Sequence, residues 1–151
     1  PAETAPDNKP DKSAKKRAVK LGEGDLVGRL EVPRLDLSVM VMEGTGSRTL
    51  RLGAGRIPGT AYPWTTGNMG IAAHRDTYFR PLKDIQKNDT ITFTTVDGRE
   101  TYRVTSTQIV MPKDTHVLKP TKTDTLTLVT CYPFYYIGSA PKRFIVQATK
   151  E

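Results

Sequence analysis

The stretch TLTLVTC, residues 125–131, decides the fold and contains the only cysteine of the chain. Threonine and leucine alternate along it. This period of two predicts a half-buried β-strand, because successive side chains of a strand point to opposite faces. Leu126 and Leu128 share one face, and Cys131 lies on the other face at the predicted end of the strand. If the leucines enter the core, the thiol faces outward. Pro133 then ends the strand, since it has no backbone N–H to donate.

The position of Cys131 is that of a nucleophile in a groove, at a strand end and followed by aromatic residues. The alternative is a packed structural cysteine, because free Cys is among the most buried residue types and usually behaves as a small hydrophobe. Catalysis would need a base or a positive neighbour, since the thiolate is the attacking species.

Two histidines can supply acid/base chemistry. His116 lies in a long predicted connection, where a solvated imidazole is the ordinary expectation. His74 ends the run MGIAA, residues 69–73, whose small side chains would let a substrate backbone pass close by. A lone histidine at a strand end is commonly structural. A strand-terminal cysteine in the same chain favours His74 as the acid/base partner of Cys131.

Arg143 is the candidate for stabilising negative charge on a reacting carbonyl oxygen. It opens the last predicted strand, after the connection that follows Cys131. Phe144 and Val146 alternate on the apolar face of that strand, which leaves Arg143 on the outward face, as for Cys131. The alternative is that Arg143 is an ordinary solvated arginine at a sheet edge, and its neighbour Lys142 is the residue most easily mistaken for the functional one.

The chain has 151 residues and a formal net charge of +7, from 23 Lys and Arg against 16 Asp and Glu. This length suits one domain with a hydrophobic core. A single cysteine excludes an intramolecular disulfide and any C-x-x-C metal or redox pair. No apolar run reaches the roughly 18 residues of a membrane span. A basic surface could suit nucleic acid, anionic lipid head groups or an anionic cell-wall polymer.

Residues 1–24 are rich in Pro, Ala, Lys and Asp and carry almost no large apolar side chains. We expect them to form a flexible basic tether, because they cannot bury enough surface to offset the entropy of ordering. Residues 25–151 should then form the folded domain. Much of the excess charge lies in residues 9–20, and no stripe of aromatic and basic residues follows it, which argues against nucleic-acid binding. Folding of the tether back over a groove stays open.

Short alternating segments separated by turn residues predict an all-β domain, a closed barrel or a sandwich. The segment 48–54 is the best short helix, and 110–124 is a long connection of the kind that is usually functional or mobile. The strands are predicted at residues 26–32, 35–42, 68–73, 90–94, 100–109, 125–131 and 143–149.

The motif TLVTC at 127–131, followed by Arg143 and preceded by AAHRD at 72–76, resembles the sortases. These are cysteine transpeptidases that attach proteins to bacterial cell walls or to one another. The resemblance covers about residues 26–148, in the order His, Cys, Arg. The sequences around His74 and Cys131 are most similar to class D sortases. Many members have Gly before the histidine where this chain has Ala73, a difference of one methyl group.

This resemblance implies a closed eight-stranded sortase-type β-barrel with short helices in the connections. It implies that His74, Cys131 and Arg143 are catalytic. The expected reaction cleaves a Leu-Pro-x-Thr-Gly/Ala-like sorting signal after Thr through a cysteine thioester, and transfers the acyl group to an amine. The expected partners are surface proteins with a C-terminal sorting signal and an amine acceptor, either a peptidoglycan cross-bridge or a pilin Lys. The expected location is the extracellular face of the bacterial cytoplasmic membrane, through a single-pass anchor absent from this chain.

The connection 110–124 corresponds to the family's loop that receives the Leu-Pro part of the signal. Some family members bind calcium through clustered acidic residues beside this loop. No such cluster is visible here, so no metal and no cofactor are expected. The candidate substrate-binding residues are Ala72, Ala73, Met111, Val117, Leu118 and Thr130.

Two other functions are compatible with the same residues. A cysteine hydrolase on this scaffold would release a free acid even with an amine in excess. A non-catalytic β-barrel adhesion module would keep Cys131 as a packed, slowly reacting thiol.

Overall fold

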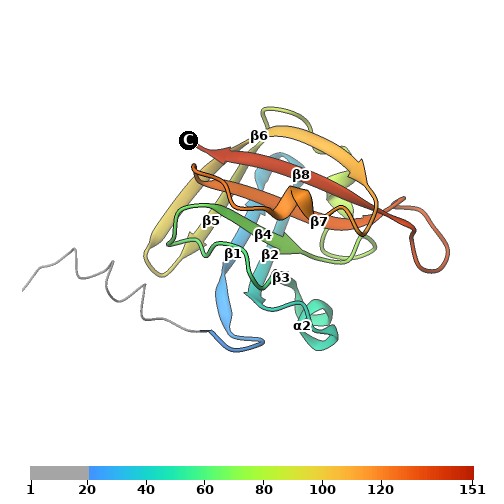
Figure 1. Cartoon of the computed structure of the whole chain (residues 1–151), viewed down its shortest axis with the longest axis horizontal. Helices are drawn as coiled ribbons and strands as arrows, with labels where there is room; N and C mark the ends of the chain where they lie inside the picture. The colour runs from blue at the N-terminus through green and yellow to red at the C-terminus, as the bar shows by residue number, and fades with distance from the viewer. Residues whose placement is uncertain (1–20) are drawn as a thin grey trace, which may run out of the picture.

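A computed structural model describes residues 21–151, whose strands close into a single barrel (Figure 1). Around the barrel the strand order is β1-β2-β3-β4-β7-β8-β6-β5. The pairs β2–β3 and β4–β7 are parallel and the other pairs are antiparallel. The strands are β1 Leu26–Val32, β2 Leu37–Glu43, β3 Ala54–Arg56, β4 Asn68–Ala72, β5 Thr90–Thr95, β6 Gly98–Val110, β7 Thr125–Tyr132 and β8 Lys142–Lys150. The predicted closed eight-stranded barrel is confirmed.

Helical structure is confined to the connections, as predicted. The helix α2 spans Ser47–Leu52, and the residues described also form three 3₁₀ turns, each between two strands. They are η1 Pro33–Leu35, η2 Arg80–Asp84 and η3 Thr115–Leu118.

Apolar side chains at alternate positions along the strands fill the barrel interior. In β7, Leu126 and Leu128 are fully buried. Phe79 and Phe93, from other parts of the chain, are equally buried in the same core. The alternation in residues 125–131 therefore has the predicted inward face, and Cys131 is only half-buried on the other one.

The predicted helix 48–54 is wrong at its end, because Ala54 belongs to β3. The helix stops at Gly53, and Ala54–Arg56 pairs in parallel with the end of β2. A Cβ on Gly55 would lie only 1.9 Å from the carbonyl oxygen of Gly44, so glycine is required at this backbone crossing. Three residues are too few for a period to be visible in the sequence.

The second strand also begins later than predicted. Pro33 fixes the φ angle that starts the turn η1, and Asp36 adopts a left-handed conformation with φ 54° that ends it. Asp36 donates its N–H to the Pro33 carbonyl at 3.0 Å, and β2 starts at the next residue.

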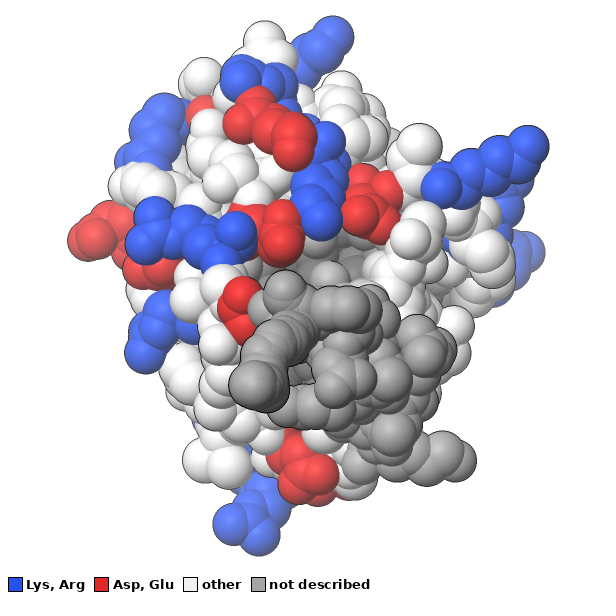
Figure 2. Space-filling view, turned by 90° about the vertical axis from the view of Figure 1, so that its left-hand side faces the viewer, with Lys and Arg blue, Asp and Glu red and all other residues white. Residues whose placement is uncertain are grey.

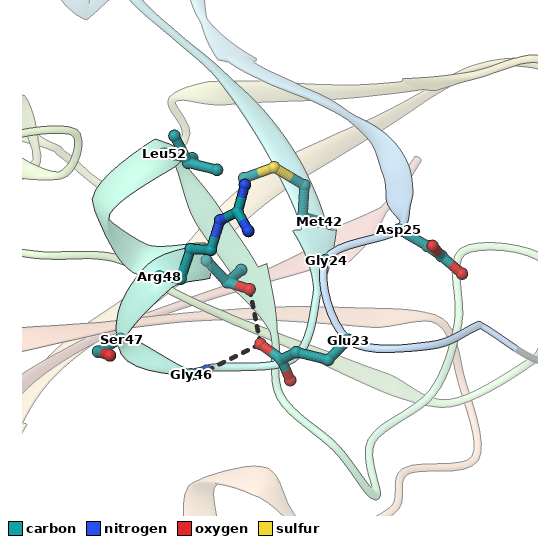
Figure 3. A pocket seen from close by; sticks show the side chains of 9 residues that line it. Glu23, Gly24, Asp25, Met42, Gly46, Ser47, Arg48 and Leu52 are labelled. Carbon is teal, nitrogen blue, oxygen red and sulfur yellow. Dashed lines mark hydrogen bonds between the residues drawn. The ribbon is translucent and has the colours of Figure 1, made fainter.

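Residues 21–24, assigned by sequence to the tether, already contact the barrel. Leu21 packs against the core, and Gly24 donates its N–H to the Glu43 carbonyl at 2.8 Å. The Glu23 carboxylate accepts hydrogen bonds from the Gly46 N–H at 3.0 Å and the Thr49 hydroxyl at 2.6 Å, beside a pocket of about 480 Å³ (Figure 3). The rest of the predicted tether, residues 1–20, lies outside the described residues, as does any contact it makes with the groove.

Charged side chains of both signs are interspersed on the face shown in Figure 2, and no uniform basic patch covers the residues described there. No helix within residues 21–151 is long and apolar enough to cross a membrane.

Candidate active site

Cys131 and Arg143 face each other across two neighbouring strands. Their Cα atoms are partners in the antiparallel register of β7 and β8. Directly opposite residues project from the same face of a sheet, with Cβ atoms typically about 5 Å apart. Both residues are half-buried on the outer face of the barrel. The placement of the two side chains on one face agrees with the alternation predicted from the sequence.

His74 lies just beyond the end of β4, the strand on the other side of β7. Ala72 is the partner of Val129 in the parallel register, and the Ala73 N–H still donates to the Val129 carbonyl at 3.2 Å. Continued by two residues, this register brings His74 alongside Cys131. The side chain of His74 is exposed. Segments far apart in the chain thus bring the three candidate catalytic residues to the same end of the barrel.

The backbone around His74 is fixed on both sides. The buried Thr130 hydroxyl donates to the Ala73 carbonyl at 2.7 Å. After the histidine, the His74 carbonyl accepts the N–H of Phe79 at 3.1 Å, and the fully buried Phe79 ring anchors that turn in the core. The position of the imidazole is therefore set by backbone hydrogen bonds and core packing.

The Arg143 guanidinium rests against the connection that precedes it. Its Nη1 donates to the Lys142 carbonyl at 2.9 Å and to the Ala140 carbonyl at 3.3 Å. Arginine carries five N–H donors. Within residues 21–151, Nε and Nη2 of Arg143 make no hydrogen bond, so these donors stay free for an oxyanion beside Cys131.

The connection between β6 and β7 covers the outer face of β4, β7 and β8 (Figure 1). The Val117 carbonyl in η3 accepts Nδ2 of Asn68 at 2.9 Å and Nε2 of Gln147 at 3.0 Å. Asn68 Nδ2 also donates to the Lys119 carbonyl at 3.1 Å, and Asn68 Oδ1 accepts the Thr127 hydroxyl at 2.6 Å. These buried polar bonds fix η3 against the outer face of the barrel.

Gly70 in β4 allows two segments to approach the outer face at once. A Cβ at this position would lie 2.8 Å from Leu118 Cδ2 in η3, and 3.2 Å from both Ile57 Cδ1 and Thr60 Cγ2. The Gly70 N–H donates to the Thr60 hydroxyl at 3.1 Å. Arg56, buried and paired with Glu43 at 2.7 Å, donates to the Thr60 carbonyl at 2.6 Å and so fixes this second segment.

The predicted substrate-binding residues fall into two groups. Ala72, Met111 and Leu118 have accessible side chains, with Met111 44% exposed one residue after Val110, the β6 partner of Arg143. Val117 is buried in η3.

The second group points inward. The Ala73 and Thr130 side chains are 6% and 2% exposed, and they belong to the barrel interior. Their contacts support the segment before His74. His116, in η3, is exposed, as expected of a solvated imidazole.

Sequence reasoning missed the polar residues that hold the walls. Asn68, Thr127 and Gln147 lie on the outer faces of three neighbouring strands, and their hydrogen bonds join η3 to the barrel. The available signal was the alternation in 68–72, which puts Asn68, Gly70 and Ala72 on one face. Residues 21–151 contain no group of three or more His, Cys, Asp or Glu side chains arranged to hold a metal ion.

Comparisons with known proteins agree with this geometry. A sortase domain model matches residues 30–151. The chain is 34% identical over 140 residues to Sortase D of Bacillus subtilis, covering 92% of this chain and 71% of that protein. It is 30% identical over 120 residues to Sortase A of Listeria monocytogenes, covering 77% of this chain and 54% of that protein. The solved structure of a Clostridium perfringens Sortase D5 transpeptidase superimposes with a TM-score of 0.81 at 26% identity, covering 95% and 89% of the two chains.

The fold and these matches thus define a transpeptidase domain built on a β-barrel. The chain belongs to the sortase family. It is a sortase-type transpeptidase, and the predicted similarity to class D sortases is confirmed by the two Sortase D matches. Sortases are enzymes associated with the cell surface.

Proposed function

We propose that residues 25–151 cleave a Leu-Pro-x-Thr-Gly/Ala-like sorting signal after its Thr and transfer the acyl group to an amine. One observation carries the proposal. Cys131 lies directly opposite Arg143 on the outer face, at the barrel end where the chain leaving β4 presents His74. A thiol, an imidazole and a guanidinium on one face are the groups that acyl transfer requires.

In the first half-reaction, the Cys131 thiolate attacks the carbonyl carbon of the Thr residue. Arg143 donates hydrogen bonds to the oxyanion that forms. The C–N bond then breaks, His74 as imidazolium gives its proton to the leaving amine, and a thioester joins Cys131 to the substrate.

In the second half-reaction, the nitrogen of the incoming amine attacks the thioester carbonyl, and His74 takes a proton from that amine. The new amide forms, and Cys131 leaves as thiolate. None of these steps requires a metal or a cofactor. Ligation rather than hydrolysis follows if the amine outcompetes water for the thioester.

The outer face beside η3 is the surface we propose for an extended apolar peptide. Ala72, Leu118 and Met111 have accessible side chains for contacts with the Leu-Pro part, and the buried Val117 would act by holding η3 in place. Ala73 and Thr130 act from the interior, by fixing the backbone before His74.

The partners we propose are surface proteins that carry a C-terminal sorting signal. The amine acceptor is a peptidoglycan cross-bridge or a pilin Lys. The full-length protein would act at the extracellular face of the cytoplasmic membrane, through a single-pass anchor that precedes the tether.

The test is incubation with a library of sorting-signal peptides and candidate amines, with ligated products read by mass spectrometry. Cys131→Ala should abolish thioester formation and turnover. Arg143→Lys should be severely impaired, because an ammonium is a point charge where a planar fork of donors is needed. The matched control is Lys142→Ala, an exposed neighbour whose strand partner is Tyr132, and it should turn over like the wild type.

The outcomes separate the alternatives. Release of free acid with amine in excess would identify a hydrolase. Absence of any product, together with slow iodoacetamide alkylation of Cys131 that His74→Ala does not change, would identify a non-catalytic module.

A further inference from the structure

The connection 133–141, between β7 and β8, joins Cys131 to Arg143 and extends away from the barrel (Figure 1). Its backbone makes few hydrogen bonds. In the part of the chain that the structure describes, its carbonyls accept bonds only from Arg75, at Tyr136 and Gly138, and from Arg143, at Ala140. Arg75 is thus the one residue outside the loop and its flanking strand that hydrogen-bonds its backbone.

Both bonds from Arg75 come from a single nitrogen. Nη2 donates to the Tyr136 carbonyl at 2.7 Å and to the Gly138 carbonyl at 3.0 Å. Arg75 directly follows His74 in the chain. The loop also accepts a hydrogen bond from Arg143 at the Ala140 carbonyl, so a shift of the loop would move the Arg143 guanidinium relative to His74.

The Arg75 side chain is held at an energetic cost. Its Nε is buried and has no hydrogen-bond partner among residues 21–151. An unpaired buried N–H disfavours the folded state. Arg75 therefore makes its two bonds to the loop in spite of this unpaired N–H.

A second contact to the loop uses a side chain instead of the backbone. The guanidinium of Arg80 lies over the ring of Tyr135, 4.6 Å from its centroid. Tyr135 is 69% exposed, and this contact involves no backbone group of the loop. Arg75 thus contacts the backbone of the loop, whereas Arg80 contacts only a side chain of it.

We propose that Arg75 is a positioning residue for transpeptidation. Its guanidinium holds the loop that joins Cys131 to Arg143 against the segment that carries His74. This inference rests on the proposed function of those three residues. Arg75 acts through the loop and contacts neither the thiol nor the scissile bond.

The test measures kcat and KM for ligation of a Leu-Pro-x-Thr-Gly peptide to an amine by the whole chain. Arg75→Ala should lower kcat about 10- to 100-fold, because small displacements of catalytic groups have effects of this size, while KM stays within about threefold. Arg75→Lys should recover part of the loss, since one ammonium can donate to both carbonyls. Arg75→Gln should not, because its amide is too short to reach them. The control Arg80→Ala should stay within about twofold of wild type.

Several results would overturn the proposal. These are an unchanged kcat in Arg75→Ala, an equal loss in Arg80→Ala, or a change confined to KM or to the thermal midpoint. Should Arg75→Ala fail to fold, the order of kcat in Arg75→Lys and Arg75→Gln decides, and equal values in the two would refute the role. Wild-type protein that gives no ligation refutes the proposed function itself. Wild-type ligation with active Arg75 variants refutes only this inference.

Discussion

Two connections flank Cys131 and Arg143, and they are held in opposite ways. The connection 111–124 is fixed by buried hydrogen bonds from Asn68 and Gln147 to the carbonyls of η3. The connection 133–141 packs Phe134 into the core at its start, is hydrogen-bonded by Arg75, and carries the fully exposed Ile137 at its tip. The first is a wall held against the barrel by buried polar groups. The second is anchored in the core at its start by Phe134 and, among the described residues, is hydrogen-bonded near its exposed tip by Arg75 alone.

The largest effect should come from removing the polar support of this wall. Asn68→Ala leaves the Val117 and Lys119 carbonyls and the Thr127 hydroxyl with fewer partners in a buried site. Buried polar groups without partners cost about 1–3 kcal/mol each, so we expect a loss of about 2–3 kcal/mol in the free energy of unfolding. The peptide KM should rise because η3 loses its position. Urea denaturation and steady-state kinetics measure the two effects.

A control separates wall geometry from stability. Asp89 accepts hydrogen bonds from Arg34 at 2.7 and 2.8 Å, at the barrel end opposite Cys131. The Arg34 hydrogen bond is the main cause that lowers the pKa of Asp89. This pair therefore stabilises the fold above the unfolded-state pKa, and the contribution is lost as the pH falls through the folded-state pKa.

Asp89→Asn should accordingly reduce stability at neutral pH, by an amount that shrinks in acid, and leave KM unchanged. An equal rise of KM in Asp89→Asn and Asn68→Ala would mean that the wall has no specific role.

The next effect concerns the fit of η3 on β4. Gly70→Ala places a methyl group 2.8 Å from Leu118 Cδ2. Overpacking of this kind costs about 1–3 kcal/mol, and here it should push Leu118 outward and raise KM more than it lowers kcat. The double variant Gly70→Ala/Leu118→Val should recover part of the lost affinity. No recovery would show that peptide binding does not depend on the contact between these two residues.

The sequence predicted seven of the eight strands, and the resemblance to the sortases implied their closure into a barrel. Alternation in residues 125–131 and 143–149 predicted that Cys131 and Arg143 share a face, because a period of two fixes which side chains lie together. Cys131 and Arg143 were therefore placed on one face before their pairing was known. The register itself depends on the whole barrel and could not be predicted from either strand alone.

The residues that support the candidate site could not be predicted either, because their contacts also depend on the whole fold. Arg75 reads as the start of a loop, and its bonds reach carbonyls more than sixty positions along the chain. Carbonyl acceptors carry no sequence signal, since every residue has one. The short β3 escaped prediction because its pairing with β2 depends on the close approach of Gly55 to Gly44, a tertiary contact.

The smallest effect should come from the exposed tip of the connection 133–141. Ile137 is fully exposed, so Ile137→Ser should change the free energy of unfolding by less than about 0.5 kcal/mol, the usual range for surface sites. The matched variant in the buried wall is Val117→Ser, which removes a side chain only 5% exposed and should cost about 2 kcal/mol. Chemical denaturation of the two variants compares the connections directly. Equal losses would mean that the tip of the connection 133–141 packs against the protein as firmly as η3, and the contrast between a buried wall and an exposed tip would fail.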